Sequence, residues 1–75
     1  MVEILKGKIT RVEGLGIWRI VTVLVEGEKN EREMSISWRS CGKVVIGKRY
    51  QFSVSKIQVH GKNVIADLYP IQEEI

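Results

Sequence analysis

The sequence predicts an all-β protein folded as a small closed barrel of five strands. Apolar and polar residues alternate with a period of two in every regular segment, which is the pattern of half-buried strands. No segment keeps the apolar spacing of a helix for more than about two turns. The alternation slips once in the first segment. Such a slip predicts a β-bulge, which curves a sheet enough to close it.

The first predicted strand covers residues 5–12. Three of its residues face the interior in this register: Leu5, Gly7 and Ile9. The residues between and after them face outwards: Lys6, Lys8 and Thr10. The next apolar residue is Val12 rather than Arg11, so the bulge is expected between Ile9 and Val12. A turn at 13–16, which contains two glycines, leads into the second strand.

The second and third strands are predicted at residues 18–25 and 32–38. Their expected inward residues are Val21, Val23, Val25, Met34, Ile36 and Trp38. Their expected outward residues include Trp18, Ile20, Thr22, Leu24, Ser35 and Ser37, with Arg39 following in the same register. The second strand therefore offers an apolar and aromatic outer face, and the third strand offers hydroxyl groups.

Residues 40–47 are irregular and predict a loop or short helical turn that closes one end of the barrel with Val44 and Ile46. The fourth and fifth strands are predicted at 48–56 and 63–69, joined by a glycine-containing hairpin at 60–63. Their expected inward residues are Tyr50, Phe52, Val54, Val64, Ala66 and Leu68. Pro70 lacks a backbone donor and ends the fifth strand.

The 75 residues are long enough for one domain, with an ordered core at about 4–70 and a short tail at 71–75. A core of this size supplies only about 3–5 kcal/mol, so either a tightly closed architecture or a partner is expected, and a second copy of the chain is one candidate partner. The single cysteine, Cys41, excludes an intramolecular disulfide. No apolar run approaches about 18 residues and no signal-peptide pattern is present, so we expect a cytoplasmic protein without a membrane span.

The net charge is +3 and the isoelectric point is about 9.2, so the chain is mildly basic. Such a balance suits a protein that binds nucleic acid, and it equally suits a solvated surface rich in Lys and Glu. Abundant Lys and Glu with few Asn and Gln are typical of a thermophile.

No catalytic residues, metal ligands or cofactors are predicted, so we expect a protein that is not an enzyme. The only histidine, His60, lies in a glycine turn, where a solvated side chain is expected. The only aspartate, Asp67, has no second carboxylate at a spacing suited to hydrolysis. The serines form no recognisable nucleophile arrangement with His60 and an acid.

Five strands, a bulged first strand and an irregular connection between the third and fourth strands resemble the layout of an OB-fold. Three segments carry the resemblance: Leu5-x-Gly7-x-Ile9-x-x-Val12, Val21-x-Val23-x-Val25, and Gly47-Lys48-Arg49-Tyr50-x-Phe52. The chain is similar to archaeal members of the replication protein A and single-stranded-DNA-binding group. It departs from that group in its short loops and in the near absence of helix between the third and fourth strands. The alternative fold is an SH3-like barrel.

The resemblance implies a binding site on the outer face of the first three strands. This face would present cations to phosphates, hydroxyl groups to hydrogen-bond partners and an indole to a stacked base. The residues predicted to bind nucleic acid are Lys6, Lys8, Thr10, Arg11, Trp18, Ser35, Ser37, Arg39 and Lys62. The predicted function is binding of single-stranded nucleic acid, DNA in preference to RNA, with little sequence specificity.

The alternative function is that of a protein-interaction module, a small subunit of a replication, repair or RNA-processing complex. Outward Trp18, Ile20 and Leu24 suit a protein interface as well as they suit base stacking. Trp18 is also compatible with closing the barrel end, whereas Tyr69 is compatible with exposure beside the first strand or with edge packing. The arrangement of the charged residues distinguishes the two functions. Nucleic-acid binding requires Lys6, Lys8, Arg39 and Arg11 to converge around Trp18, and a protein interface requires an apolar centre with a charged rim.

Overall fold

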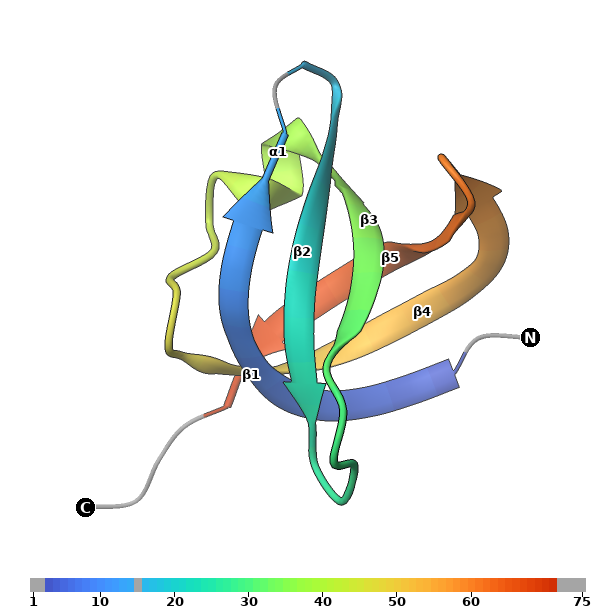
Figure 1. Ribbon diagram of the computed structural model, residues 1–75. Helices are drawn as coiled ribbons and strands as arrows, with labels where there is room; N and C mark the ends of the chain where they lie inside the picture. Colours follow the sequence, from blue (N-terminus) through green and yellow to red (C-terminus); the bar gives the residue numbers. More distant parts are fainter. Residues whose placement is uncertain (1–2, 15, 72–75) are drawn as a thin grey trace.

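The computed structural model describes residues 3–14 and 16–71, which form five strands and one short helix (Figure 1). The elements are β1 (Glu3–Glu13), β2 (Trp18–Val25), β3 (Arg32–Ser37), α1 (Trp38–Cys41), β4 (Arg49–Val59) and β5 (Lys62–Pro70). Residues 72–75 of the predicted tail lie outside the described residues.

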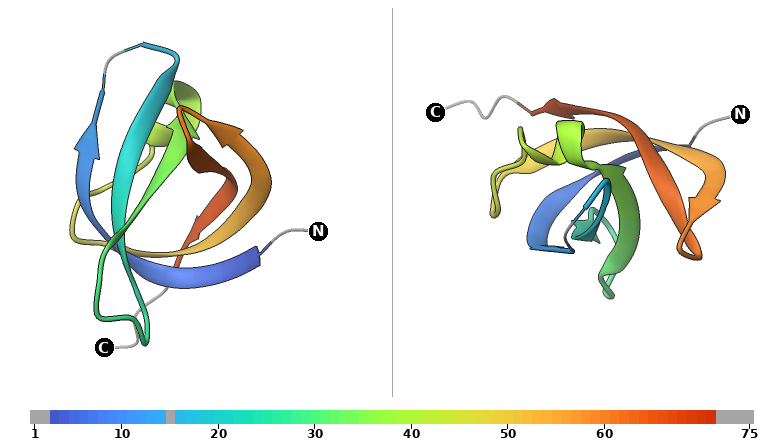
Figure 2. Two further views of the ribbon diagram at one scale, coloured as in Figure 1. Left: turned by 45° about the vertical axis from the view of Figure 1, so that its right-hand side comes forward. Right: turned by 90° about the horizontal axis from the view of Figure 1, so that it is seen from above.

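The strands close into a barrel in the order β1-β2-β3-β5-β4, and β4 pairs again with β1. The long, bent β1 makes this possible, because its residues 3–8 pair with β4 and its residues 7–13 pair with β2 (Figure 2). The pairing of β3 with β5 is parallel and the other four pairings are antiparallel. The predicted fold class is confirmed as a small all-β closed barrel of five strands with almost no helix between β3 and β4.

The bulge in β1 lies where the sequence predicts it. Ile9 pairs with Val23 and Arg11 pairs with Thr22, which leaves Thr10 as the extra residue. Gly7 lies on the inward face nearby, where β1 and β2 approach closely. A Cβ atom at Gly7 would stand 2.6 Å from the carbonyl oxygen of Leu24, so this position requires a glycine.

The barrel interior is filled by aliphatic side chains and two aromatic rings. Ten residues form the buried core: Ile9, Val21, Val23, Val25, Met34, Ile36, Tyr50, Phe52, Val54 and Ile65. The inward residues predicted for β2 and β4 are all among them, because the period-two alternation of those strands is unbroken through the core.

Two predictions for the end of β3 and the following loop are wrong. Trp38, predicted to lie in the core, is 49% exposed, because β3 ends at Ser37 and Trp38 begins α1. Val44 packs against the core as predicted, but Ile46 is 60% exposed. The loop is held to β1 by backbone hydrogen bonds, including Gly47 N to Ile9 O at 2.7 Å, and this leaves Ile46 outside.

The predicted inward register of β5 is also wrong at two positions. Ile65 is buried and Ala66 is exposed, the reverse of the prediction. The cause is a register shift between β4 and β5, since Ser53 pairs with Asp67 while the next residue, Val54, pairs with Ile65. Ala66 is the extra residue of this irregularity, and the alternation changes phase across it.

Candidate nucleic-acid interface

The cations of β1 do not converge on Trp18 as predicted. Lys6 and Lys8 are exposed, but Lys8 pairs with Leu24 near the end of β2. Trp18 is the first residue of β2 and pairs with Ser37. Six residues along a strand span about 20 Å, so Lys8 and Trp18 lie at opposite ends of the face.

The middle of the predicted face carries carboxylates beside its polar residues. Arg11 forms an ion pair with Glu13, and the Thr10 hydroxyl donates a hydrogen bond to Glu31. A shallow hollow here is lined by Thr10, Arg11, Thr22, Glu31 and Glu33. Because its two carboxylates repel phosphate, Thr10 and Arg11 lie in surroundings that disfavour a nucleic-acid backbone.

Three further predicted residues have structural surroundings of their own. Ser35 is fully buried, so its predicted exposure is wrong: the ends of β4 and β5 lie against β3 here, and the Ser35 hydroxyl donates to the Val59 carbonyl oxygen at 2.7 Å. The Ser37 hydroxyl accepts a hydrogen bond from the backbone N–H of Ser40 and caps α1. The Nζ atom of Lys62 lies 4.0 Å from Oε1 of Glu33. Glu33 is near the start of β3, whereas Trp18 pairs with the last residue of that strand.

The start of β2 and the helix α1 lie at the same end of the barrel (Figure 1), and both carry aromatic and cationic residues. We define this tryptophan–arginine cluster as Ile17, Trp18, Arg19, Trp38 and Arg39. The Trp38 backbone N–H donates to the Ile17 carbonyl oxygen at 2.8 Å and ties α1 to the start of β2. The Arg39 guanidinium lies over the exposed Trp38 ring, 5.5 Å from its centroid.

Both arginines of the cluster keep guanidinium donors available. Arg19 donates through Nε to the Gly16 carbonyl oxygen at 3.2 Å, which orients the side chain without neutralising it. Among residues 3–14 and 16–71, neither Arg19 nor Arg39 is paired with a carboxylate, whereas Arg11, Arg32 and Arg49 are. The cluster is therefore the place where unpaired positive charge adjoins an exposed indole.

Sequence reasoning predicted two members of this cluster, Trp18 and Arg39, and missed the other three. Trp38 was missed because its spacing from Met34 and Ile36 fits the core face of a strand. The available signal was Ser37, since serine is a preferred residue at the position before the first turn of a helix. A helix start at this point breaks the alternation and brings Trp38 and Arg39 next to each other on α1.

Comparisons with known proteins found no relative. No protein-family model matches the chain. No curated protein and no solved structure matches it. No helix in the described part of the chain has the length and apolar character needed to cross a membrane. The function has therefore to be argued from the chemistry of the site.

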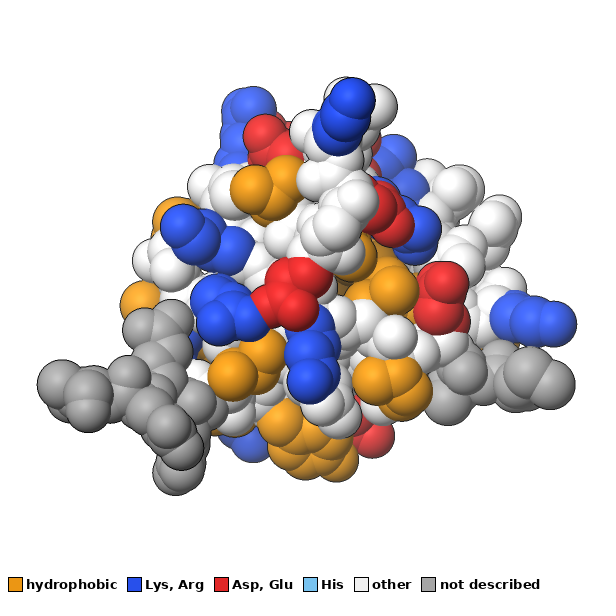
Figure 3. Space-filling model, turned by 90° about the horizontal axis from the view of Figure 1, so that it is seen from below, with side chains coloured by type: hydrophobic (Ala, Val, Ile, Leu, Met, Phe, Trp, Pro, Cys, Tyr) orange, Lys and Arg blue, Asp and Glu red, His pale blue; other side chains and the backbone are white. Residues whose placement is uncertain are grey.

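The underside of the barrel offers a second exposed aromatic residue in a different electrostatic setting. Tyr69 is exposed and shares a row with Gln51 and Lys6 across β5, β4 and β1. Arg49 nearby is paired with Glu26. Figure 3 shows the molecule from below, and on that side cations, acids and small apolar patches alternate and form no continuous basic surface.

Proposed function

We propose that this chain binds single-stranded nucleic acid through the tryptophan–arginine cluster. The observation that carries the proposal is the half-exposed Trp38 ring with the Arg39 guanidinium 5.5 Å from its centroid. A base stacks on an exposed indole whatever its identity, and an adjacent arginine neutralises the phosphate that follows. Binding by this route has little sequence preference, because every base has a π-face.

The neighbouring residues support the same use of the cluster. Trp18 is half-buried and pairs with Ser37, the residue before Trp38, so the two tryptophans belong to β2 and α1 at the same end of the barrel. Arg19 follows Trp18 directly and supplies a second cation. A short strand of nucleic acid crossing the end of the barrel meets the exposed Trp38 ring with the Arg39 guanidinium over it, and an aromatic platform with an adjacent cation is typical of single-strand binders.

Fluorescence anisotropy of labelled oligo-dT and oligo-U tests the proposal. Trp38→Ala should weaken binding by about 1–3 kcal/mol through lost stacking. The matched control is Tyr69→Ala, which removes an exposed aromatic ring from the underside and should leave the affinity unchanged. Comparing the two oligonucleotides shows whether DNA is preferred over RNA. A wild-type protein that binds neither oligonucleotide refutes the proposal, as does binding that depends on Tyr69 alone.

A protein-interaction function is the second candidate, and Ile17 is the observation that favours it. Ile17 is 67% exposed and adjoins Trp38, so the cluster also has an apolar centre with arginines around it. The two functions predict different effects of substituting Arg39 and Ile17. Nucleic-acid binding requires Arg39→Ala to weaken oligonucleotide binding more than Ile17→Ser, whereas a protein interface requires Ile17 for capture of the partner.

A further inference from the structure

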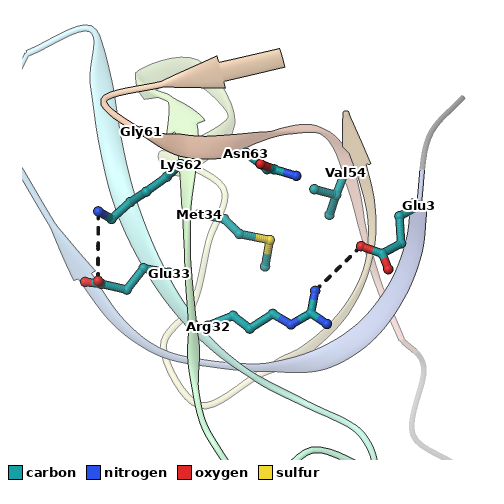
Figure 4. A pocket seen from close by; sticks show the side chains of 8 residues that line it. All are labelled: Glu3, Arg32, Glu33, Met34, Val54, Gly61, Lys62 and Asn63. Carbon is teal, nitrogen blue, oxygen red and sulfur yellow. Dashed lines mark ion pairs between the residues drawn. The ribbon is translucent and has the colours of Figure 1, made fainter. Parts of the chain in front are cut away.

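A pocket of about 350 Å³ opens between the start of β3 and the β4–β5 hairpin, away from the tryptophan–arginine cluster. Figure 4 shows its lining, with Arg32 and Glu33 from β3 on two sides and Met34 between them. Arg32 and Trp38 are six residues apart, which corresponds to about 20 Å along a strand. The pocket is therefore a separate feature at the other end of β3.

The floor of the pocket is apolar. Met34 and Val54 form it, and each is only 3% exposed because the rest of each side chain belongs to the core. A methionine sulfur makes favourable contacts with aromatic rings, and valine adds a flat aliphatic surface. The floor therefore offers a ligand a small apolar contact, and most of the remaining lining is polar.

The rim of the pocket is formed by two loose ion pairs. Lys62 Nζ lies 4.0 Å from Glu33 Oε1, and Arg32 Nη1 lies 3.6 Å from Glu3 Oε1 (Figure 4). Charged hydrogen bonds ordinarily measure about 2.7–2.9 Å between donor and acceptor, so neither ion pair makes a hydrogen bond of ordinary length. Each pair leaves hydrogen-bond donors and acceptors free to meet a ligand that carries both.

The charge of the rim disfavours an anionic ligand. Arg32 also makes two hydrogen bonds to Glu28, at 2.8 and 2.6 Å, so the two cations stand among three carboxylates. The side-chain hydrogen bond to Glu28 raises the pKa of Arg32, which keeps this guanidinium charged. A phosphate would face an excess of negative charge here, whereas a neutral ring with donors and acceptors at its edge would not.

We infer that this pocket holds one nucleobase of the bound strand, guanine in preference to the other three. This inference rests on the proposed function and adds one base-selective position to it. One face of a base meets the small apolar floor formed by Met34 and Val54, while its edge meets the two open ion pairs. Guanine presents N7 and O6 as acceptors for the cations and an amino group as donor for a carboxylate, so it satisfies both kinds of rim group.

NMR titration of the full chain with guanosine, adenosine, cytidine and uridine tests the pocket, with the Met34 ε-methyl resonance as the readout. Guanosine should shift this resonance at the lowest concentration. Glu33→Gln should weaken guanosine binding about tenfold, because it removes a charged acceptor from the rim. The matched control is Glu31→Gln, which makes the same change on an exposed neighbouring residue outside the pocket and should have no effect.

Failure of this inference is distinguishable from failure of the proposed function. Trp38→Ala should abolish the stacking contribution to oligonucleotide binding and leave the guanosine titration unchanged. Oligonucleotide binding that depends on Trp38, without any Met34 shift on adding guanosine, overturns the pocket assignment alone. A Met34 shift with guanosine, without oligonucleotide binding, supports the pocket and overturns the proposed function. Equal effects of Glu33→Gln and Glu31→Gln also overturn the pocket assignment.

Discussion

The two tryptophans of this chain lie at the same end of the barrel, on β2 and α1, and have different surroundings. Trp18 is half-buried in β2, whereas Trp38 is 49% exposed as the first residue of α1. The difference follows from the residue before Trp38. The hydroxyl of Ser37 accepts the Ser40 backbone N–H, so the chain enters a helical turn and the strand register no longer applies. A single capping residue thus places an indole outside the core.

At the residue scale, Gly7→Ala should destabilise the barrel. The added Cβ would stand 2.6 Å from the Leu24 carbonyl oxygen and 2.8 Å from a Val23 methyl group, so β1 has to move away from β2. Overpacking of this kind costs about 1–3 kcal/mol in the free energy of unfolding, measured by urea denaturation. The control is Gly42→Ala, where the nearest atoms lie at 3.7 Å and φ is −62°. Equal stability of the two variants would contradict the close approach at Gly7.

At the element scale, the alternation of the sequence predicts the strands well and their ends less well. The buried faces of β2 and β4 follow from unbroken alternation of Val21, Val23 and Val25 and of Tyr50, Phe52 and Val54. The bulge at Thr10 can be predicted from the sequence because the alternation of apolar and polar residues slips by one residue there. The shift in β5 is not readable in this way, since Val64 and Ile65 are both aliphatic and either could face the core.

The short helix α1 has its own prediction. Ser37→Ala removes the cap and should lower oligonucleotide affinity severalfold, because Trp38 and Arg39 lose their orientation on α1. Loss of an N-cap costs about 0.5–2 kcal/mol of stability, so a small decrease in melting temperature should accompany it. Ser53→Ala on the outer side of β4 is the control, and both quantities should stay at wild-type values in it. Unchanged oligonucleotide affinity in Ser37→Ala would show that α1 does not position the cluster.

At the scale of the whole molecule, the positive charge is divided among several places. The net charge is +3, and three of the five arginines are paired with carboxylates, in Arg11–Glu13, Arg32–Glu28 and Arg49–Glu26. The other two arginines lie in the tryptophan–arginine cluster, where Arg39 is beside the exposed Trp38 ring and Arg19 is on β2. This distribution indicates a modest electrostatic contribution to binding rather than a long basic track.

The salt dependence of binding tests this distribution. If Arg19 and Arg39 neutralise two phosphates, the slope of log K against log salt should be about −1.4. Arg39→Ala should reduce the slope to about −0.7 and weaken all sequences alike. Lys8→Ala, a matched change on the far part of β1, should leave the slope unchanged. A wild-type slope near −3 that becomes less steep in Lys8→Ala would instead place the bound nucleic acid on the outer face of β1.

The sequence by itself determined that the chain forms strands, which side chains of β2 and β4 are buried, and where β1 bends. These properties depend on alternation within one strand, and alternation is local. Only the tertiary structure decided which outward residues become neighbours. Lys8 and Trp18 share the face that alternation predicts, yet strand pairing puts them about 20 Å apart. Trp38, Arg39 and Trp18 lie at the same end of the barrel because a cap ends β3 beside the start of β2, and pairing of segments distant in the chain sets that position.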